Sequence, residues 1–253
     1  MNFKAIFLSS TSDEASASIQ AYFDEHAPEL SQLYNKTDVR LPFLEFPEKY
    51  VGAPEGMPII CLSRHSSKAS VNSITVHPVG NFTTNDIGGK EKDIAPSAPE
   101  IQTAILRKMS ESYSGDRYQI TFEATHHGPQ SHNPLIFAEI GTEKESWTDA
   151  EALGVLFRGI TESVPSASGN FVAAGGGHYA PKFSSYVLNN DINIGHIISK
   201  FRMAEIGEEE IEMAISKTPG CKGFIVDKKG VKATGMNMIK NVSERHNMEI
   251  ITI

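Results

Sequence analysis

Histidine side chains that follow predicted β-strands are the groups in this sequence best suited to chemistry. The strand-like segments IICLSRH, ITVH, ITFEATHH and FVAAGGGH end in His65, His77, His126, His127 and His178. Imidazole is a common ligand of transition metals, and its pKa lies near neutral pH, so it also suits acid–base catalysis. In open α/β sheets, ligands bind beyond the carboxyl ends of the strands. If these strands run parallel, we expect the imidazoles to face one crevice.

The segment FEATHHGPQSH contains three histidines within seven positions. On a helix, Glu123 would face both His126 and His127, whereas on a strand Glu123 and His127 share one face and His126 takes the other. We favour the strand, which predicts a Glu123–His127 pair and gives His126 a packing or supporting role. His132 follows the Gly128–Pro129 turn and is the least favoured of the three as a residue of the site. Any one of these histidines is equally consistent with a structural, hydrogen-bonded residue.

Three consecutive glycines precede His178 in the segment AAGGGHYAP. Gly175, Gly176 and Gly177 would allow the backbone to approach a ligand closely and to direct N–H groups at an anion or a developing oxyanion. The segment matches neither the dinucleotide-binding fingerprint nor the phosphate-binding loop. A turn that needs flexible residues explains the glycines equally well. A role in ligand binding is favoured only because His178 follows directly.

Basic residues at two places predict contacts with phosphate. In the segment LSRHSSKAS, Arg64 and Lys68 lie on either side of His65. A serine nucleophile there is less favoured, because the G-x-S-x-G motif is absent. The net charge of −8 argues against a broad nucleic-acid-binding surface, but residues 217–245 are locally basic. This stretch is either a solvated face that balances the acidic remainder or a surface for a phosphate backbone.

The composition is that of an ordinary globular protein. Hydrophobic residues make up 40% of the chain and charged residues 21%, which is enough for a sizeable core. The two cysteines exclude a disulfide framework and a cysteine-rich zinc site, and they fit a reducing, cytoplasmic setting. The apolar run near the start is too short for a signal peptide, and no segment approaches the ~18 apolar residues of a membrane span. We therefore expect no membrane association.

The elements that must position these side chains alternate between apolar runs of strand length and amphipathic segments, which is typical of an α/β domain. Two pairs have the spacing of capping boxes at helix starts: Thr11 with Glu14, and Thr148 with Glu151. The polar segment 80–99 is predicted to be a functional flap or a mobile excursion. Strands are expected at 4–10, 57–67, 73–78, 118–127, 134–141, from 170 into the glycine turn, 222–227 and 248–253, and helices at 11–26, 99–113, 148–164, 208–220 and 236–246. We expect one domain over residues 1–253, with about eight strands in a mixed sheet.

Four histidine-containing motifs resemble one known family. SRHSS, TVHPVGN, EATHHGP and GGGHYAP, in this order and at these separations, resemble the archaeal and plant type of D-aminoacyl-tRNA deacylase. The resemblance implies hydrolysis of the ester that joins a D-amino acid to the 3′ end of tRNA, with broad side-chain tolerance, a Zn²⁺ requirement and a monomeric state. It also implies a three-layer α/β/α fold around a mixed sheet, similar to peptidyl-tRNA hydrolases and nucleoside phosphorylases.

The residues and the resemblance together lead to a mechanistic hypothesis. His127, with Glu123 and His178, either holds a zinc ion whose bound water attacks the ester or positions that water directly. The expected metal ligands are His126, His127 and His178. The residues expected to bind the substrate are Arg64, His65, Lys68, His77, Gly175, Gly176 and Gly177, with the glycine amides holding the oxyanion. A phosphorylase-like or metal-dependent hydrolase of a small nucleoside or amide, and a non-catalytic tRNA-binding protein, remain alternatives.

Overall fold

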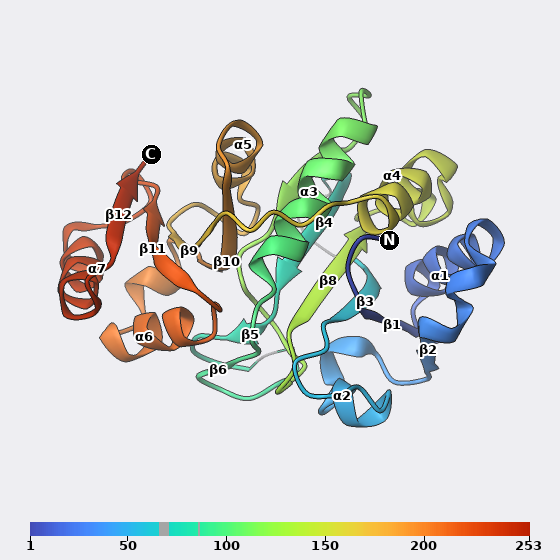
Figure 1. The fold of residues 1–253 in the computed structure, drawn as a ribbon, viewed down its shortest axis with the longest axis horizontal. Coiled ribbons are helices and arrows are strands. Elements are labelled where there is room, and N and C mark those ends of the chain that lie inside the picture. Colours follow the sequence, from blue (N-terminus) through green and yellow to red (C-terminus); the bar gives the residue numbers. More distant parts are fainter. Residues whose placement is uncertain (66–70, 86) are drawn as a thin grey trace.

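The computed structural model describes residues 1–65, 71–85 and 87–253. Its largest sheet has six strands in the order β2-β1-β3-β8-β4-β7 (Figure 1). These strands are β1 (Ile6–Ser10), β2 (Tyr34–Thr37), β3 (Ile59–Arg64), β4 (Ser73–Pro78), β7 (Gln119–Phe122) and β8 (Leu135–Ile140). Strand β3 pairs parallel with β1 and β8, whereas β4 pairs antiparallel with β8 and parallel with β7. The sheet is mixed, as predicted, but β3 and β4 run in opposite directions.

A second sheet has four parallel strands in the order β10-β9-β11-β12. They are β9 (Gly169–Ala174), β10 (Ile192–Ile198), β11 (Cys221–Val226) and β12 (Glu249–Thr252), and a short antiparallel pair joins β5 (Gly80–Asn81) to β6 (Asp93–Ile94). The expected single sheet is therefore wrong in detail, because the strands of the described residues divide among three sheets. Strands β2, β5, β6 and β10 were not predicted.

The helices begin and end close to the predicted positions, but their caps differ. They are α1 (Glu14–His26), α2 (Pro47–Tyr50), α3 (Pro99–Ser112), α4 (Ala150–Thr161), α5 (Pro181–Asn189), α6 (Glu208–Ser216) and α7 (Ala233–His246). The α1 helix is capped by Asp13, whose carboxylate accepts hydrogen bonds from the N–H groups of Ala15 and Ser16. Asp149 caps α4 in the same way. A carboxylate next to the helix thus replaces each predicted threonine cap. Helices α2 and α5 were not predicted.

Helices cover the two large sheets on different faces. One face of the six-stranded sheet packs on α1, α3 and α4, and this core continues to β9 and β10. Helices α6 and α7 cover the outer face of the four-stranded sheet, and Figure 1 shows them at the end of the molecule opposite α1 and α4. The α/β class with a mixed central sheet and flanking helices is therefore confirmed. No helix in the described ranges is long and apolar enough to cross a membrane.

The remaining face of the six-stranded sheet carries a smaller apolar cluster that includes Cys61 and Phe137. Because successive side chains on a strand alternate between faces, Glu139 shares this face with Phe137. His77 lies directly opposite Phe137 in the β4–β8 pairing, and its ring stacks on the phenylalanine at 5.6 Å between centroids. The sheet therefore presents ionisable side chains beside an apolar patch, on the side away from α1, α3 and α4.

Candidate active site

Two buried carboxylates form the centre of the candidate site. Glu139 is the last residue but one of β8 and is 3% exposed, and Glu123 directly follows β7 and is fully buried. His65, at the end of β3, places its Nδ1 2.9 Å from Glu123 Oε1 and 3.4 Å from Glu139 Oε2. The Nε2 atom of His77 lies 3.8 Å from the same Glu139 oxygen. Four strands of the large sheet, β3, β4, β7 and β8, thus bring two acids and two imidazoles together.

Mutual attraction within this group outweighs the cost of burying its charges. Burial raises the pKa of a carboxyl, but His178 and His65 hold the pKa of Glu123 well below its usual range. Burial also raises the pKa of Glu139, but its hydrogen bonds with His65 and His77 outweigh this effect and lower the pKa to about 2. Burial lowers the pKa of His65, but Glu123 and Glu139 raise it to about 11. Two carboxylates therefore stay ionised at neutral pH, and His65 carries the compensating positive charge.

Three imidazoles beside this charged group have their Nδ1 atoms engaged by the backbone. His77 Nδ1 lies 3.0 Å from the Pro78 carbonyl oxygen, His126 Nδ1 lies 2.8 Å from that of Ala124, and His127 Nδ1 bonds that of Gly128. A carbonyl oxygen only accepts hydrogen bonds, so each Nδ1 is the protonated donor. In the neutral tautomer, each Nε2 then carries the lone pair that a metal ion or a proton would use.

The protonation of His126 and His127 differs from that of His65. Burial and the neighbouring His127 and His77 lower the pKa of His126 well below its usual value. Burial and His77 also lower the pKa of His127 to about 4. Both rings are therefore neutral at pH 7, which is the form that ligates metals and accepts protons.

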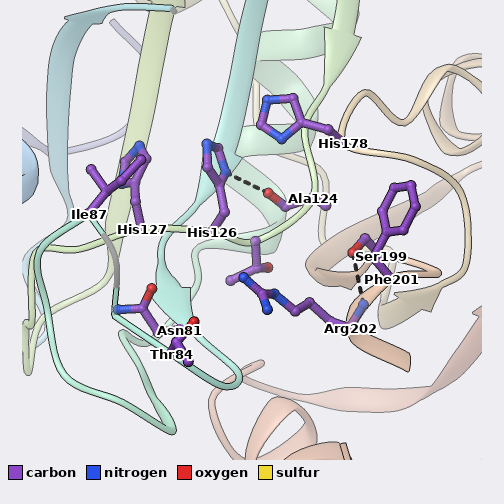
Figure 2. A pocket seen from close by; sticks show the side chains of 11 residues that line it. Asn81, Thr84, Ile87, Ala124, His126, His127, His178, Ser199, Phe201 and Arg202 are labelled. Atoms are coloured by element: carbon purple, nitrogen blue, oxygen red, sulfur yellow. Dashed lines mark hydrogen bonds between the residues drawn. The ribbon is translucent and has the colours of Figure 1, made fainter. Parts of the chain in front are cut away.

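The imidazoles open onto two adjoining cavities of about 390 and 180 Å³. His126, His127 and His178 line both cavities, and Glu139 lies at the smaller one. Figure 2 shows the three rings on one side of the larger cavity, with Phe201 on another side. The arrangement therefore presents the neutral rings of His126 and His127, with His178 beside them, to a solvent-accessible space above a buried charged group.

Comparison with known proteins identifies the family. The model of the D-aminoacyl-tRNA deacylase family matches residues 54–251. The chain belongs to this family. It is 46% identical to the D-aminoacyl-tRNA deacylase of Thermoplasma acidophilum over 77% of each chain, and 31% identical to that of Ignicoccus hospitalis over 84% of this chain and 85% of the relative. The resemblance stated from the histidine motifs is confirmed.

A solved structure shares the fold of this deacylase family member. It is described as a conserved protein of unknown function, and it matches all of this chain and 96% of its own with a TM-score of 0.91. Because the two sequences are only 24% identical, this similarity supports the architecture alone.

The predicted Glu123–His127 pair is not formed in this deacylase family member. Glu123 Oε2 instead lies 3.0 Å from His178 Nε2 and 3.6 Å from His126 Nε2. Strand β7 ends at Phe122, and His127 has a φ of 47°, so the alternation of strand faces does not extend across the segment. His126, which was assigned to the opposite face, therefore faces the carboxylate.

The metal-ligand set also differs from the expected one. Three groups of side chains bring their ligand atoms within 4.8 Å of one another among the described residues: His77 with His126 and His127, His65 with Glu123 and His178, and His77 with Glu123 and Glu139. The expected set of His126, His127 and His178 is not among these groups. His77, which was predicted to bind the substrate, takes the place of His178 beside the other two rings.

The other predicted residues are placed less centrally. Arg64 lies at the smaller cavity with its Nε 3.7 Å from an Asp13 oxygen, and Lys68 lies outside the described residues. The N–H group of Gly175 donates to the Ile198 carbonyl and is not available to an oxyanion. Gly176 and Gly177 line a separate cavity. The predicted oxyanion role of Gly175 is therefore wrong.

Two peripheral features of the sequence have structural explanations. His132 pairs with the buried Glu48 at 3.2 Å, away from the other histidines. Arg245, in the basic C-terminal stretch, forms ion pairs of 2.7 Å with Glu208 and Glu212. At that position the basic and acidic segments neutralise each other, which favours the solvated-face interpretation there.

Glu139 and His196 were not predicted from the sequence. Glu139 is the single charged residue of the apolar segment PLIFAEI, which was the available signal. His196 lies in the overlooked β10, fully buried, and its Nε2 donates to the Ala95 carbonyl at 3.0 Å while its Nδ1 accepts from the Thr125 hydroxyl at 3.1 Å. His196 thereby fixes Thr125 beside His126, and its role is structural.

His196 is expected to make folding sensitive to acid. Burial lowers the pKa of His196 from 6.5 to about 3. Below pH 6.5, His196 is therefore protonated in the unfolded chain but stays neutral in the folded chain until the pH approaches 3. Its contribution to stability is complete above pH 6.5 and declines as the pH falls toward 3. Between pH 6 and 4, the unfolding free energy of wild type should fall by about 1.4 kcal/mol per pH unit more steeply than that of His196→Gln. Urea titrations at several pH values measure this difference, with the exposed His26→Gln as the control. Parallel curves for wild type and His196→Gln would contradict it.

Proposed function

We propose that this protein hydrolyses the ester bond between a D-amino acid and the 3′ end of tRNA, releasing free tRNA and the D-amino acid. Family membership and the names of the relatives support this reaction. The observation that carries it is the open cavity lined by His126, His127 and His178 above the ionised Glu123. An aminoacyl ester is already activated, so a positioned water and a nearby base are sufficient, and no covalent nucleophile is required.

His178 is the group best placed to take the proton of the attacking water. Its Nε2 lies 3.0 Å from Glu123, so the buried carboxylate orients the ring and stabilises the imidazolium that forms. In the described part of the chain no group pairs with its Nδ1, and its side chain is 39% exposed. Water oxygen attacks the ester carbonyl as Nδ1 takes the proton, and the same proton then passes to the departing ribose oxygen. Glu123 and His178 thus keep the catalytic roles that the sequence predicted.

The residues present fit a zinc ion at His77, His126 and His127. Three imidazoles with Nδ1 donated to backbone carbonyls are the usual donor set of a catalytic zinc. His126 and His127 are already neutral, whereas burial lowers the pKa of His77 but Glu139 and Glu123 raise it above its usual value, so binding of zinc would require a proton to leave His77. The Nε2 atom of His77 is also buried without a hydrogen-bond partner among the described residues, which is consistent with a metal ligand. When bound, zinc lowers the pKa of its water and polarises a carbonyl oxygen. His127 would therefore act as a ligand and His178 as the base.

The remaining features of the proposal follow from the substrate. An aminoacylated tRNA 3′ end carries phosphates that Arg64 could contact at the rim of the smaller cavity, and it is encountered in the cytoplasm, which fits a chain with two free cysteines. Selection of the D form would come from steric exclusion of the L side chain, which is compatible with broad side-chain tolerance. We further propose that the protein acts as a monomer.

One assay tests the proposed reaction. Purified protein is incubated with D-tyrosyl-tRNA and with L-tyrosyl-tRNA, and the release of free tyrosine is followed. We expect the D ester to be cleaved much faster than the L ester, with uncatalysed hydrolysis as the baseline for each. Equal rates, or no release from either, would contradict the proposal. Turnover of nucleosides or amides without tRNA would instead support a small-molecule hydrolase.

A further inference from the structure

A separate cavity of about 360 Å³ lies next to the histidine site and contains an excess of lysines. We call it the lysine cavity; it is lined in part by Gly176, Gly177, Lys182, Lys200, Asp227 and Lys229. His178 lines the histidine cavities, whereas its neighbours Gly177 and Tyr179 line the lysine cavity. One short segment of chain therefore separates the proposed catalytic base from a basic cavity.

The lysine cavity has a net positive charge. Asp227 is its one carboxylate among the described lining residues, and Lys182 Nζ lies 2.7 Å from it. In the described ranges, neither Lys200 nor Lys229 forms an ion pair with a carboxylate. Two cationic side chains therefore remain uncompensated in one concave space, which favours an anionic ligand.

The glycine segment adds backbone donors to these charges. Gly176 has a φ of +74°. A Cβ placed on Gly230 would lie 2.6 Å from the backbone nitrogen of Gly176, so the chain segments that contain these two glycines approach each other closely. No described group accepts a hydrogen bond from the N–H of Gly176 or Gly177. Backbone N–H groups and lysines around one cavity are the donors that proteins use to bind phosphate oxygens.

An exposed aromatic residue joins the lysine cavity to the histidine site. Phe201 is 60% exposed and lines the larger histidine cavity (Figure 2), while the preceding Lys200 lines the lysine cavity. Lys200 Nζ lies 5.1 Å from the centre of the Phe201 ring. Single-stranded nucleic acids are commonly bound by an aromatic ring that stacks on a base beside cations that contact the backbone.

We propose that the lysine cavity binds a phosphate of the 3′-terminal nucleotides of the tRNA, and that Phe201 stacks on an unpaired base at the same end. This inference rests on the proposed function, since the ester must then lie at His178. A nucleotide whose base lies on Phe201 would extend its backbone past Lys200, with its ester linkage on the side of the histidines. The lysine cavity would thereby orient the scissile bond.

Kinetics at several salt concentrations test the phosphate contact. The double variant Lys200→Ala/Lys229→Ala is compared with Lys36→Ala/Lys144→Ala, which removes the same charge from exposed lysines that pair with Asp24 and Glu14. We expect the first variant to raise KM for D-aminoacyl-tRNA about tenfold more than the control and to reduce the slope of log KM against log salt by about 1. Equal KM values, or equal slopes, in the two variants would overturn the proposal.

A phosphate-free substrate separates this role from a general loss of catalysis. The 3′-ester of a D-amino acid with adenosine carries the base and the scissile bond but no phosphate. The Lys200→Ala/Lys229→Ala variant should lose at least about fivefold more kcat/KM on tRNA than on this ester. Equal losses on both would show a structural defect and overturn the proposal. Phe201→Ala should impair both substrates about tenfold, and Phe201→Tyr should restore them, because only the ring is needed.

Binding of uncharged tRNA provides a readout that is independent of hydrolysis. If wild type cleaves neither ester, the proposed function fails, but the lysine cavity is still supported if Lys200→Ala/Lys229→Ala weakens tRNA binding relative to the control. Inorganic phosphate serves as the competing probe. Should phosphate bind wild type at millimolar concentration while the variant retains full tRNA affinity, the cavity is a site for free phosphate, and the tRNA contact is excluded.

Discussion

Replacing Glu123 with glutamine is expected to lower kcat/KM for D-aminoacyl-tRNA by about 100- to 10,000-fold, the range typical of removing a group from an acid–base pair. Glutamine keeps the shape of the side chain but removes its charge. The ring of His178 would lose the carboxylate that lies 3.0 Å from its Nε2, and the imidazolium formed during water attack would lose its stabilising charge. Single-turnover rates with D-tyrosyl-tRNA measure the effect.

The same substitution should change the protonation of His65. Glu123 is one of two carboxylates that raise the pKa of His65 to about 11, so its neutralisation should lower that pKa toward the ordinary value. Nuclear magnetic resonance titration of the imidazole follows this change without reference to turnover. An unchanged His65 pKa would mean that the carboxylate does not interact with this ring as the structure indicates.

Glu48→Gln is the matched control for Glu123→Gln. Glu48 is also a buried glutamate beside a histidine, with one oxygen 3.2 Å from His132 and the other accepting a hydrogen bond from the Ser131 hydroxyl. It lies away from the histidine cavities, so its substitution should leave kcat/KM within about twofold of wild type. If folded Glu123→Gln retained more than a tenth of wild-type activity, Glu123 would not orient the base.

The gathering of the histidines could be predicted because it depends on a coarse property of the sequence. Four apolar runs of strand length each end in a histidine. The rings of His65, His77, His126 and His178 do lie next to one another in the folded chain. The reason given for the meeting was only partly right. Strands β3 and β4 are antiparallel, so His65 and His77 converge on Glu139 from opposite directions along the sheet, rather than from one edge.

The pairing within the site could not be predicted because it depends on where a strand ends. Face alternation assigns Glu123 to the correct side, since Glu123 continues the series from Thr121, which lies beside Thr75 on the face of Glu139. It fails between Glu123 and His127, because the regular strand ends at Phe122 and His127 adopts a positive φ. The alternation of side chains along a strand does not show where the strand ends. An error of one residue in the position of that end assigns every following side chain to the wrong face of the sheet.

Glu139 was overlooked for a different reason. Its segment is otherwise apolar, so the hydrophobic pattern predicts the strand and leaves the single acid unexplained. A carboxylate in a buried strand is costly unless it is paired, and that cost is itself the signal that partners lie nearby. The partners, His65 and His77, come from other strands, which is long-range information that a local pattern does not contain.

Loss of bound zinc is the expected result of replacing His127 with alanine. Wild type should retain about one Zn²⁺ per chain after dialysis, because three imidazoles can reach one ion, whereas His127→Ala should bind zinc at least about 100-fold more weakly. Metal content is measured directly, and added zinc should raise the thermal unfolding temperature of wild type but not of His127→Ala. His132→Ala, which removes a histidine paired with Glu48 outside the three ligand groups, should retain the metal.

Chelation then distinguishes a catalytic ion from a structural one. If the ion at His77, His126 and His127 takes part in the reaction, removing it should abolish most hydrolysis of D-tyrosyl-tRNA while the protein remains folded, and zinc should restore it. His178 and Glu123 belong to a different ligand group and are expected to remain in place when the metal is removed. Full D-specific hydrolysis after removal of the metal would therefore assign the chemistry to His178 and Glu123 alone. Retention of both zinc and activity by His127→Ala would instead exclude this histidine as a ligand, and it would move the reacting ester toward the pair formed by His178 and Glu123.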